Sequence, residues 1–195
     1  MGRIGMAPEQ KRKRILLEAR RLFVARGFHE VSVPDIVKAS GVSTGTVYKN
    51  FGSKRELAKE IYRVSLIELE KRVEVRVSKV HTTYEKVNAI IEILLELSEI
   101  NSDLISYLFL SDDIAFCKTD DQLSEIPTSH IMFKIFAEGI EKSDLCPGDL
   151  TSKVFAFYGV VLMNIKMYFN SRKKDPLCRG NYKDITRRAW NASFI

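Results

Sequence analysis

The sequence predicts an all-α protein, and three observations support this fold class. The chain of 195 residues has only five prolines and ten glycines, so few residues would interrupt helices. Apolar side chains recur at helical spacing in several separate segments. In residues 1–60, no segment alternates apolar and polar side chains in the way that a half-buried strand would. We therefore expect about nine helices.

Capping patterns mark the first two helices. The first helix lies in residues 14–26, and Gly27 is suited to its C-terminal end. The second helix covers about residues 33–39, because Ser32 and Asp35 match the S-x-x-D capping box. The apolar stripe of the first helix consists of Ile15, Leu16, Ala19, Leu22 and Phe23.

A short third helix and a long fourth helix follow. Gly41 ends the second helix, and Ser43 is in position to cap the third. The third helix would carry Val47 and Phe51 toward the interior. The fourth helix then begins at about Lys54 and runs to the mid-70s.

The remaining two thirds of the chain are also predicted to be helical. Apolar side chains again recur at spacings of three and four residues, and polar segments with proline or glycine separate the later helices. The expected helices cover residues 83–99, 101–116, 127–142, 150–170 and 182–192.

Positive charge is concentrated in the first 60 residues. They contain 13 Lys or Arg and 6 Asp or Glu, a balance of +7, whereas residues 61–195 have a balance of −1. A basic segment on a nearly neutral body suggests that this segment meets a polyanion. On charge alone, a solvated basic surface without a partner explains the pattern equally well.

The stretch GVSTGTVYKNF, residues 41–51, allows two interpretations. Its first five residues match G-x-S-x-G, the pattern of a hydrolase nucleophile elbow, in which Ser43 would be the nucleophile. The stretch also fits the turn and second helix of a helix-turn-helix. A nucleophile elbow needs a strand before the serine, but the preceding segment DIVKAS is predicted to be helical. We therefore favour the helix-turn-helix.

Cysteine content and hydropathy indicate a cytoplasmic protein. Cys117, Cys146 and Cys178 are widely separated, and three cysteines cannot all pair within one chain, so we expect reduced thiols. No secretory signal is recognisable near the N-terminus. The most apolar window, residues 154–165, is too short to span a bilayer, so no membrane partner is expected.

Several spaced motifs occur together in residues 9–62. They are A-x-x-L-F in the first helix, the G-F turn after it, the stretch DIVKASGVSTGTVYKNF, and S-K-x-x-L at the start of the fourth helix. This combination resembles the N-terminal domain of TetR/AcrR-type transcriptional regulators. Asn50 departs from the family, which more often has histidine there. The resemblance implies a helix-turn-helix DNA-binding domain over residues 1–53 and a helical ligand-binding and dimerisation domain over residues 54–195.

Polar residues near three helix starts are expected to contact DNA. Thr44 and Thr46 stand at the N-terminal end of the third helix, where base edges are met, and Gly45 lets the helix start approach the DNA backbone closely. Lys54 and Ser32 stand at helix N-termini, which favour phosphate groups. The predicted DNA-binding set is Ser32, Ser43, Thr44, Gly45, Thr46, Tyr48, Lys49, Asn50 and Lys54.

The larger half is expected to bind a small molecule. Flat aromatic rings and flexible methionines suit an adaptable pocket, although an ordinary core explains each of these residues individually. The family uses such a pocket to sense an inducer. The predicted pocket residues are Tyr62, Leu66, Tyr107, Phe109, Phe116, Met132, Phe133, Phe136, Tyr158 and Met163.

The eighth predicted helix is apolar nearly all the way round, which suggests burial on two sides. The family builds its dimer interface from the last two long helices, and a dimer suits paired half-sites in DNA. The predicted interface residues are Val161, Ile165, Tyr168, Ile185, Ala189 and Trp190. Phe155, Tyr158 and Met163 are expected to turn toward the pocket.

Taken together, the residues and the resemblance predict a ligand-responsive, homodimeric transcriptional regulator. It would be a repressor that a small-molecule inducer of unknown identity releases from a palindromic operator in double-stranded DNA. No enzyme activity, metal or cofactor is expected, because no metal cluster, P-loop or paired catalytic set occurs in the sequence. Two alternatives are a helical enzyme and a protein-binding regulator, each with an accessory helix-turn-helix. Intact Ser43, Thr44, Tyr48 and Lys54 argue against lost DNA contacts.

Overall fold

The computed structural model describes residues 7–111, 117, 127–170 and 182–194, and every regular element in these ranges is a helix. This confirms the predicted all-α fold class. Judged by length and hydropathy, none of the helices within these ranges could cross a lipid bilayer. The elements are α1 (Pro8–Arg26), α2 (Val33–Ser40), α3 (Thr44–Phe51), α4 (Lys54–Val77), α5 (Thr83–Ile100), α6 (Ser102–Ile105), the π-helix η1 (Ser106–Leu110), α7 (Ser129–Glu141), α8 (Leu150–Asn170) and α10 (Tyr182–Phe194).

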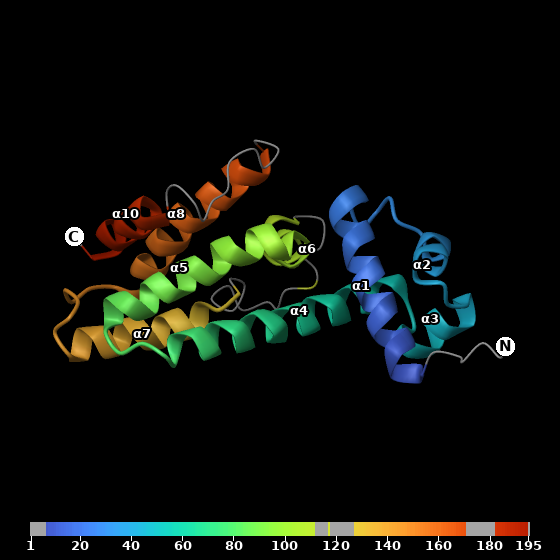
Figure 1. Ribbon diagram of the computed structural model, residues 1–195, viewed down its shortest axis with the longest axis horizontal. Helices are drawn as coiled ribbons and strands as arrows, with labels where there is room; N and C mark the ends of the chain where they lie inside the picture. Colours follow the sequence, from blue (N-terminus) through green and yellow to red (C-terminus); the bar gives the residue numbers. More distant parts are fainter. Residues whose placement is uncertain (1–6, 112–116, 118–126, 171–181, 195) are drawn as a thin grey trace.

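The helices form two regions that α4 joins (Figure 1). Helices α1, α2 and α3 lie together at one end of the molecule and are called the head below; the rest of the chain from α4 onward is the body. Helix α4 packs against α1 and α3 and also against α5, so both regions share it. The predicted domain boundary between residues 53 and 54 falls at the first residue of this shared helix, and it stays a prediction.

Side-chain caps explain where several helices begin. At α2 the Ser32 hydroxyl oxygen accepts the N–H of Asp35 at 3.3 Å, while the Asp35 carboxylate accepts the N–H of Ser32 at 2.9 Å. This confirms the predicted capping box. Thr82 and Glu85 form the same reciprocal pair at the start of α5, with distances of 3.2 and 3.0 Å. Local hydrogen bonding therefore sets these boundaries.

The sixth predicted helix has a different form in the structure. Its α-helical part is the single turn of α6, and the chain continues as the π-helix η1. Five consecutive side chains, those of residues 104–108, are buried here, which an ordinary amphipathic helix would not bury. The hydroxyl of Tyr107 donates to the carbonyl oxygen of Ala58 in α4 at 2.9 Å, so this distorted segment is tied to the helix that links head and body. The rest of the predicted helix, residues 112–116, lies outside the described ranges.

Candidate functional site

The turn between α2 and α3 has the geometry of a helix-turn-helix. Gly41 ends α2 with φ of +68° and ψ of +21°, a left-handed conformation in which a side chain would be strained. Its N–H donates to the carbonyl oxygen of Val37 at 2.9 Å. The following Val42 is buried, so the turn is pinned to the core of the head. These constraints fix the direction in which α3 leaves α2.

Ser43 caps α3 as predicted. Its hydroxyl oxygen accepts the N–H of Thr46 at 3.3 Å, and the two hydroxyl groups lie 2.9 Å apart. The cap leaves Ser43, Thr44 and Gly45 exposed at the helix start. Thr46 is half-buried, since its hydroxyl faces the cap. The N-terminal end of α3 is therefore a short polar surface on a fixed backbone.

Helix α3 has one buried face and one exposed face. Val47 and Phe51 are 1% and 8% exposed, and both belong to the hydrophobic core, as predicted. On the opposite face Tyr48 is 50% exposed, and Lys49 is exposed as well. Asn50 is also exposed, and its side-chain amide donates to the carbonyl oxygen of Thr46 at 2.7 Å. The structure therefore brings the predicted residues of this helix to one solvent-facing surface.

Gly45 stands where a side chain would meet nothing among the described residues. A Cβ placed there has no described atom within 4 Å. Packing within the chain therefore does not require a glycine at this position. Close approach of another molecule to the start of α3 remains a reason for glycine at this position, as expected from the sequence.

Two predicted phosphate contacts, Lys54 and Ser32, are engaged within the protein. The Lys54 ammonium donates to the carbonyl oxygens of Phe28 and Val31 at 2.8 and 2.9 Å, and it lies 4.3 Å from the centre of the Phe28 ring. An ammonium has three hydrogens, so one is left over for another acceptor. The hydroxyl of Ser32 lies 2.6 Å from the Asp35 carboxylate. Both residues therefore have a structural role besides any contact with DNA.

The Asp35 carboxylate carries a strongly stabilised negative charge in the first turn of α2. The hydroxyl and N–H of Ser32, with a smaller effect of Arg26, lower the pKa of this carboxyl from 3.8 to about 2. A guanidinium nitrogen of Arg26 lies 3.4 Å from it. The carboxylate thus neutralises part of the positive charge of α1, while the exposed face of α3 has no acidic residue.

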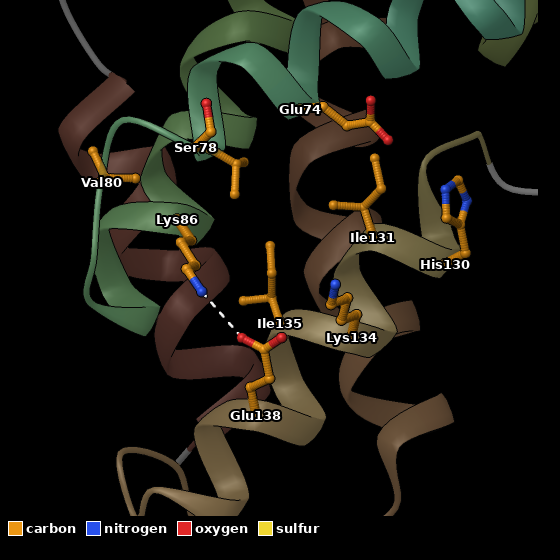
Figure 2. A pocket seen from close by; sticks show the side chains of 10 residues that line it. Glu74, Ser78, Val80, Lys86, His130, Ile131, Lys134, Ile135 and Glu138 are labelled. Carbon is orange, nitrogen blue, oxygen red and sulfur yellow. Dashed lines mark hydrogen bonds and ion pairs between the residues drawn. The ribbon is translucent and has the colours of Figure 1, made fainter.

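A cavity of about 520 Å³ opens in the body, between the C-terminal end of α4, the α4–α5 loop, α5 and α7 (Figure 2). Valine and isoleucine side chains form its apolar wall, and charged groups line its rim. Lys86 of α5 and Glu138 of α7 form an ion pair at 3.1 Å across the rim, and the hydrogen bond from Lys86 is the largest cause of the lowered pKa of Glu138. The cavity is lined by Glu74, Val77, Ser78, Val80, Lys86, His130, Ile131, Lys134, Ile135 and Glu138.

None of the ten predicted pocket residues lines this cavity. Tyr107, Met132, Phe136 and Tyr158 are fully buried in the core, and Tyr62 is nearly so. Leu66, Phe109 and Phe133 are partly buried against the core, and Phe116 lies outside the described ranges. The ring of Phe157 contacts both Phe136 and Tyr158. Most of the predicted residues therefore fill the core or pack against it, whereas Phe109 and the exposed Met163 line a separate, smaller cavity beside α8. The pocket assignment stays a prediction.

Three residues on the rim of the cavity are regularly spaced in the sequence but were not among the predicted site residues. His130, Lys134 and Glu138 are spaced by four residues, which places them on one face of α7. Charged residues at this spacing normally form a solvated surface, so the spacing alone does not mark a cavity. Within the described part of the chain, no group of three or more His, Cys, Asp or Glu could hold a metal ion.

Helix α8 presents a different face outward from the one we predicted. Val161 and Ile165 are fully buried within the single chain, and Tyr168 is 9% exposed. Ile185 and Ala189 are buried where α10 packs against α8 and α5, and Trp190 packs edge-on against Tyr84 of α5 at 4.9 Å. Five of the six predicted interface residues are therefore buried within the protomer, and Trp190 is partly buried against its core. A face of the helix that is buried in this way is not free to meet a second copy, so the position of the interface stays a prediction.

The outward face of α8 instead contains Phe155, Met163 and Met167, which are 49%, 59% and 63% exposed. The prediction had turned Phe155 and Met163 toward the pocket; only Tyr158 faces inward. Gly159 lies between these exposed residues, and a Cβ on it would meet no described atom within 4 Å. Exposed apolar side chains at spacings of four and eight residues make a continuous stripe along the helix.

Comparison with known proteins agrees with the geometry of the head. Residues 15–61 match the model of the family described as bacterial regulatory proteins, tetR family. The head of the chain therefore resembles the DNA-binding part of that family. Its N-terminal part is also 39% identical over 57 residues to the HTH-type transcriptional regulator AcrR of Shigella flexneri. That match covers 29% of this chain and 26% of AcrR, so the chain spans about a quarter of the length of this relative.

Solved structures resemble the chain over nearly its whole length. The transcriptional regulator FadR from Bacillus subtilis, solved with stearoyl-CoA, has a TM-score of 0.78 at 18% identity, covering 91% of this chain and 96% of FadR. AibR, solved with isovaleryl coenzyme A and operator DNA, has a TM-score of 0.69 at 20% identity, covering 94% of this chain and 98% of AibR. At such low identity these likenesses show that the body as well as the head shares this fold.

Proposed function

We propose that the chain is a ligand-responsive, homodimeric transcriptional regulator that binds operator DNA through the exposed end of α3. Its regulatory mode would be repression, with a small-molecule inducer releasing the protein from a palindromic operator. The observation that carries the proposal is the capped and exposed start of α3. There Ser43, Thr44 and Gly45 form a polar surface whose backbone is fixed by the buried residues Val47 and Phe51.

The chemistry of this surface fits double-stranded DNA. Short hydroxyl side chains can reach base edges in the major groove, while Tyr48 and Lys49 one turn later can reach the sugar–phosphate backbone. The basic balance of the first 60 residues would attract DNA of any sequence. The match of the head to the tetR family and the operator DNA bound to AibR support this proposal.

The body is proposed to hold the effector. Its cavity combines an apolar wall with a charged rim, which suits a molecule with an apolar part and a polar end. The acyl-coenzyme A molecules bound to FadR and AibR are of this kind and support the proposal. Effector binding beside the C-terminal end of α4 would reorient this helix and so separate the two recognition helices of a dimer. Affinity for a two-half-site operator would then fall.

Dimerisation is proposed through the outward stripe of α8. Phe155, Met163 and Met167 offer apolar surface, and Gly159 would allow the same helix of a second copy to approach closely. A two-fold axis beside this stripe makes the contact isologous, because each copy presents the same residues to the other. A dimer of this kind would present two copies of α3 to successive major grooves.

Selection from random DNA duplexes tests the proposal. The purified full chain should enrich sequences with two related half-sites, and fluorescence anisotropy then measures its affinity for the enriched duplex. Lys49→Glu, on the exposed face of α3, should weaken binding by about tenfold or more. Lys71→Glu reverses an exposed charge on α4 in the body and serves as the matched control, with affinity close to that of the wild type. Folded protein that enriches no sequence would refute the proposed function.

A further inference from the structure

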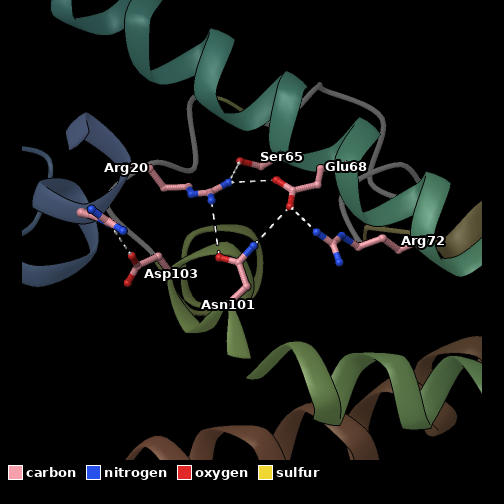
Figure 3. Close-up of polar contacts among 7 residues, drawn as sticks. Arg20, Ser65, Glu68, Arg72, Asn101 and Asp103 are labelled. Carbon is pink, nitrogen blue, oxygen red and sulfur yellow. Dashed lines mark hydrogen bonds and ion pairs between the residues drawn. The ribbon is translucent and has the colours of Figure 1, made fainter. Parts of the chain in front are cut away.

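Arg20 is a buried cation where the head meets the body (Figure 3). It belongs to α1, yet it is only 8% exposed, and arginine is rarely buried without a partner. One terminal nitrogen lies 3.1 Å from the Ser65 hydroxyl and 3.4 Å from the Glu68 carboxylate, both on α4. The other terminal nitrogen lies 3.5 Å from the side-chain oxygen of Asn101. A single side chain of the head therefore contacts two segments of the body.

Asn101 is the residue between α5 and α6, and its side chain is turned toward Arg20. At the start of a helix, an asparagine side chain usually accepts an N–H of the first turn, but Asn101 makes no such bond with α6. Its oxygen instead accepts from Arg20, and its amide donates to Glu68 at 3.2 Å. The side chain of the residue just before α6 therefore contacts α1 and α4.

Glu68 belongs to the same cluster and connects it to a second cation, Arg72, which is exposed. One carboxylate oxygen accepts from Arg20, and the other accepts from Asn101 and from Arg72, the latter at 3.1 Å. A further ion pair between head and α6 lies alongside, where Arg21 is 3.6 Å from Asp103. Movement of α6 relative to α1 would have to break or stretch these contacts.

We propose that Arg20, Glu68 and Asn101 form a clasp that couples α6 to the DNA-binding head. In this arrangement the position of α6 and the orientation of α1 change together, and α1 packs against α2, which is followed directly by the recognition helix α3. The clasp acts as a positioning device and touches neither DNA nor effector. The proposal rests on the proposed function only in that it uses operator DNA as the perturbation.

A clasp is distinguishable from a device for stability. Replacing a buried ion pair with an apolar side chain of similar volume is often neutral or stabilising for folding. The buried Nε of Arg20 has no hydrogen-bond partner among the described residues, so this arginine is not an optimal choice for stability alone. Arg20→Met should therefore keep the fold while removing every polar contact of Arg20 with α4 and with Asn101. Glu68 would still have Arg72 and Asn101.

Hydrogen–deuterium exchange of the full chain, with and without a duplex selected from random DNA, tests the clasp. Linkage is reciprocal, so DNA bound by the head must also affect α6 if the two are coupled. In the wild type, DNA should slow exchange of residues 102–110 by about fivefold or more, which is the lower end of ordinary allosteric coupling. In Arg20→Met this protection should drop below about twofold, while α3 is still protected by DNA.

Two further variants keep the test decisive. Asn101→Ala leaves Arg20 bound to Ser65 and Glu68 and removes the hydrogen bonds that Asn101 makes with Arg20 and Glu68, so it should lose the protection of residues 102–110 as Arg20→Met does. Arg72→Ala removes a contact of Glu68 that does not involve the head, so it should behave like the wild type. Protection of α3 without protection of α6 in the wild type would overturn the clasp and leave the proposed function intact. Equal protection of α6 in Asn101→Ala and the wild type would also overturn it.

Discussion

The ammonium nitrogen of Lys54 lies 2.8 Å from the carbonyl oxygen of Phe28 and directly over the ring of the same residue. Lys54 is the first residue of α4, and Phe28 belongs to the loop between α1 and α2. The start of α4 is therefore attached to the loop on which α2 depends, by a charge-assisted hydrogen bond and a cation–π contact. Lys54 donates a second hydrogen bond to the carbonyl oxygen of Val31 in the same loop.

Lys54→Ala should lower both stability and DNA affinity. Loss of two hydrogen bonds from a charged donor should reduce the free energy of unfolding by about 1–3 kcal/mol, measured by urea denaturation. Binding to all DNA sequences should weaken alike, because the change removes a potential phosphate contact and loosens the head without altering base contacts. Lys49→Ala is the matched control, since it should weaken binding and leave stability unchanged. An unchanged stability of Lys54→Ala would contradict the structural role.

Thr44→Ala should instead alter base preference at particular operator positions. Thr44 is exposed at the start of α3, and removing its hydroxyl does not disturb the cap formed by Ser43 and Thr46. Selection from random duplexes with the variant and the wild type would show which positions relax. Identical preferences would mean that this end of α3 does not read bases.

Gly45→Ala separates protein stability from DNA approach. Alanine is a better helix former than glycine by up to about 1 kcal/mol, and the added methyl group meets no described atom of the protein, so thermal stability should stay equal or rise. DNA affinity should fall by about tenfold, because overpacking a close contact costs about 1–3 kcal/mol. Differential scanning calorimetry and anisotropy measure the two effects. Undiminished affinity would place the DNA backbone away from the start of α3.

DNA binding should be steeply dependent on salt. If a dimer neutralises about six to ten phosphates, affinity should fall roughly 10³- to 10⁵-fold between about 50 and 200 mM salt. Each lost phosphate contact lowers the slope of log affinity against log salt by about one, so Lys49→Ala should lower it by about two in a symmetric dimer. A flat dependence would exclude the basic head as the source of binding energy.

The two faces of α8 should respond differently to an introduced charge. Met163→Glu places a carboxylate on the exposed stripe, so the protomer should fold but remain monomeric and bind a two-half-site operator poorly. Val161→Glu places it at a fully buried position, so the protomer itself should lose about 3 kcal/mol or more of stability. Sedimentation equilibrium and circular dichroism distinguish the outcomes. A dimeric Met163→Glu protein with normal operator affinity would move the interface elsewhere.

The head could be predicted closely because its determinants are local. The S-x-x-D pattern at Ser32 and Asp35 and the cap at Ser43 form within four residues of chain, so the sequence contains both partners of each hydrogen bond. At Gly41 the residue type alone indicates a left-handed backbone, because glycine adopts this conformation without strain. The cap of α5 at Thr82 and Glu85 has the same local character and could have been found in the same way.

The body could be predicted only as a set of helices. Helix α8 has apolar residues on every face, so periodicity could not distinguish Val161, which faces the core, from Met163, which faces solvent. Buried aromatic side chains such as Phe136 look the same in sequence whether they line a pocket or fill a core. The contacts of Lys54 and Arg20 join residues 23–81 positions apart, and no local pattern indicates such pairs.

Helix α4 has 24 residues without a break, which corresponds to a rod about 36 Å long. The cavity adjoins the C-terminal end of α4. Lys54, the first residue of α4, is hydrogen-bonded to the loop between α1 and α2 in the head. A tilt of only about 5° about the cavity end displaces the other end of such a rod by about 3 Å. That displacement is close to the spacing of successive base pairs, about 3.4 Å along the duplex. In the proposed regulator, a helix of this length would convert a tilt too small to disrupt the packing of the body into a misalignment of about one base-pair step at the head.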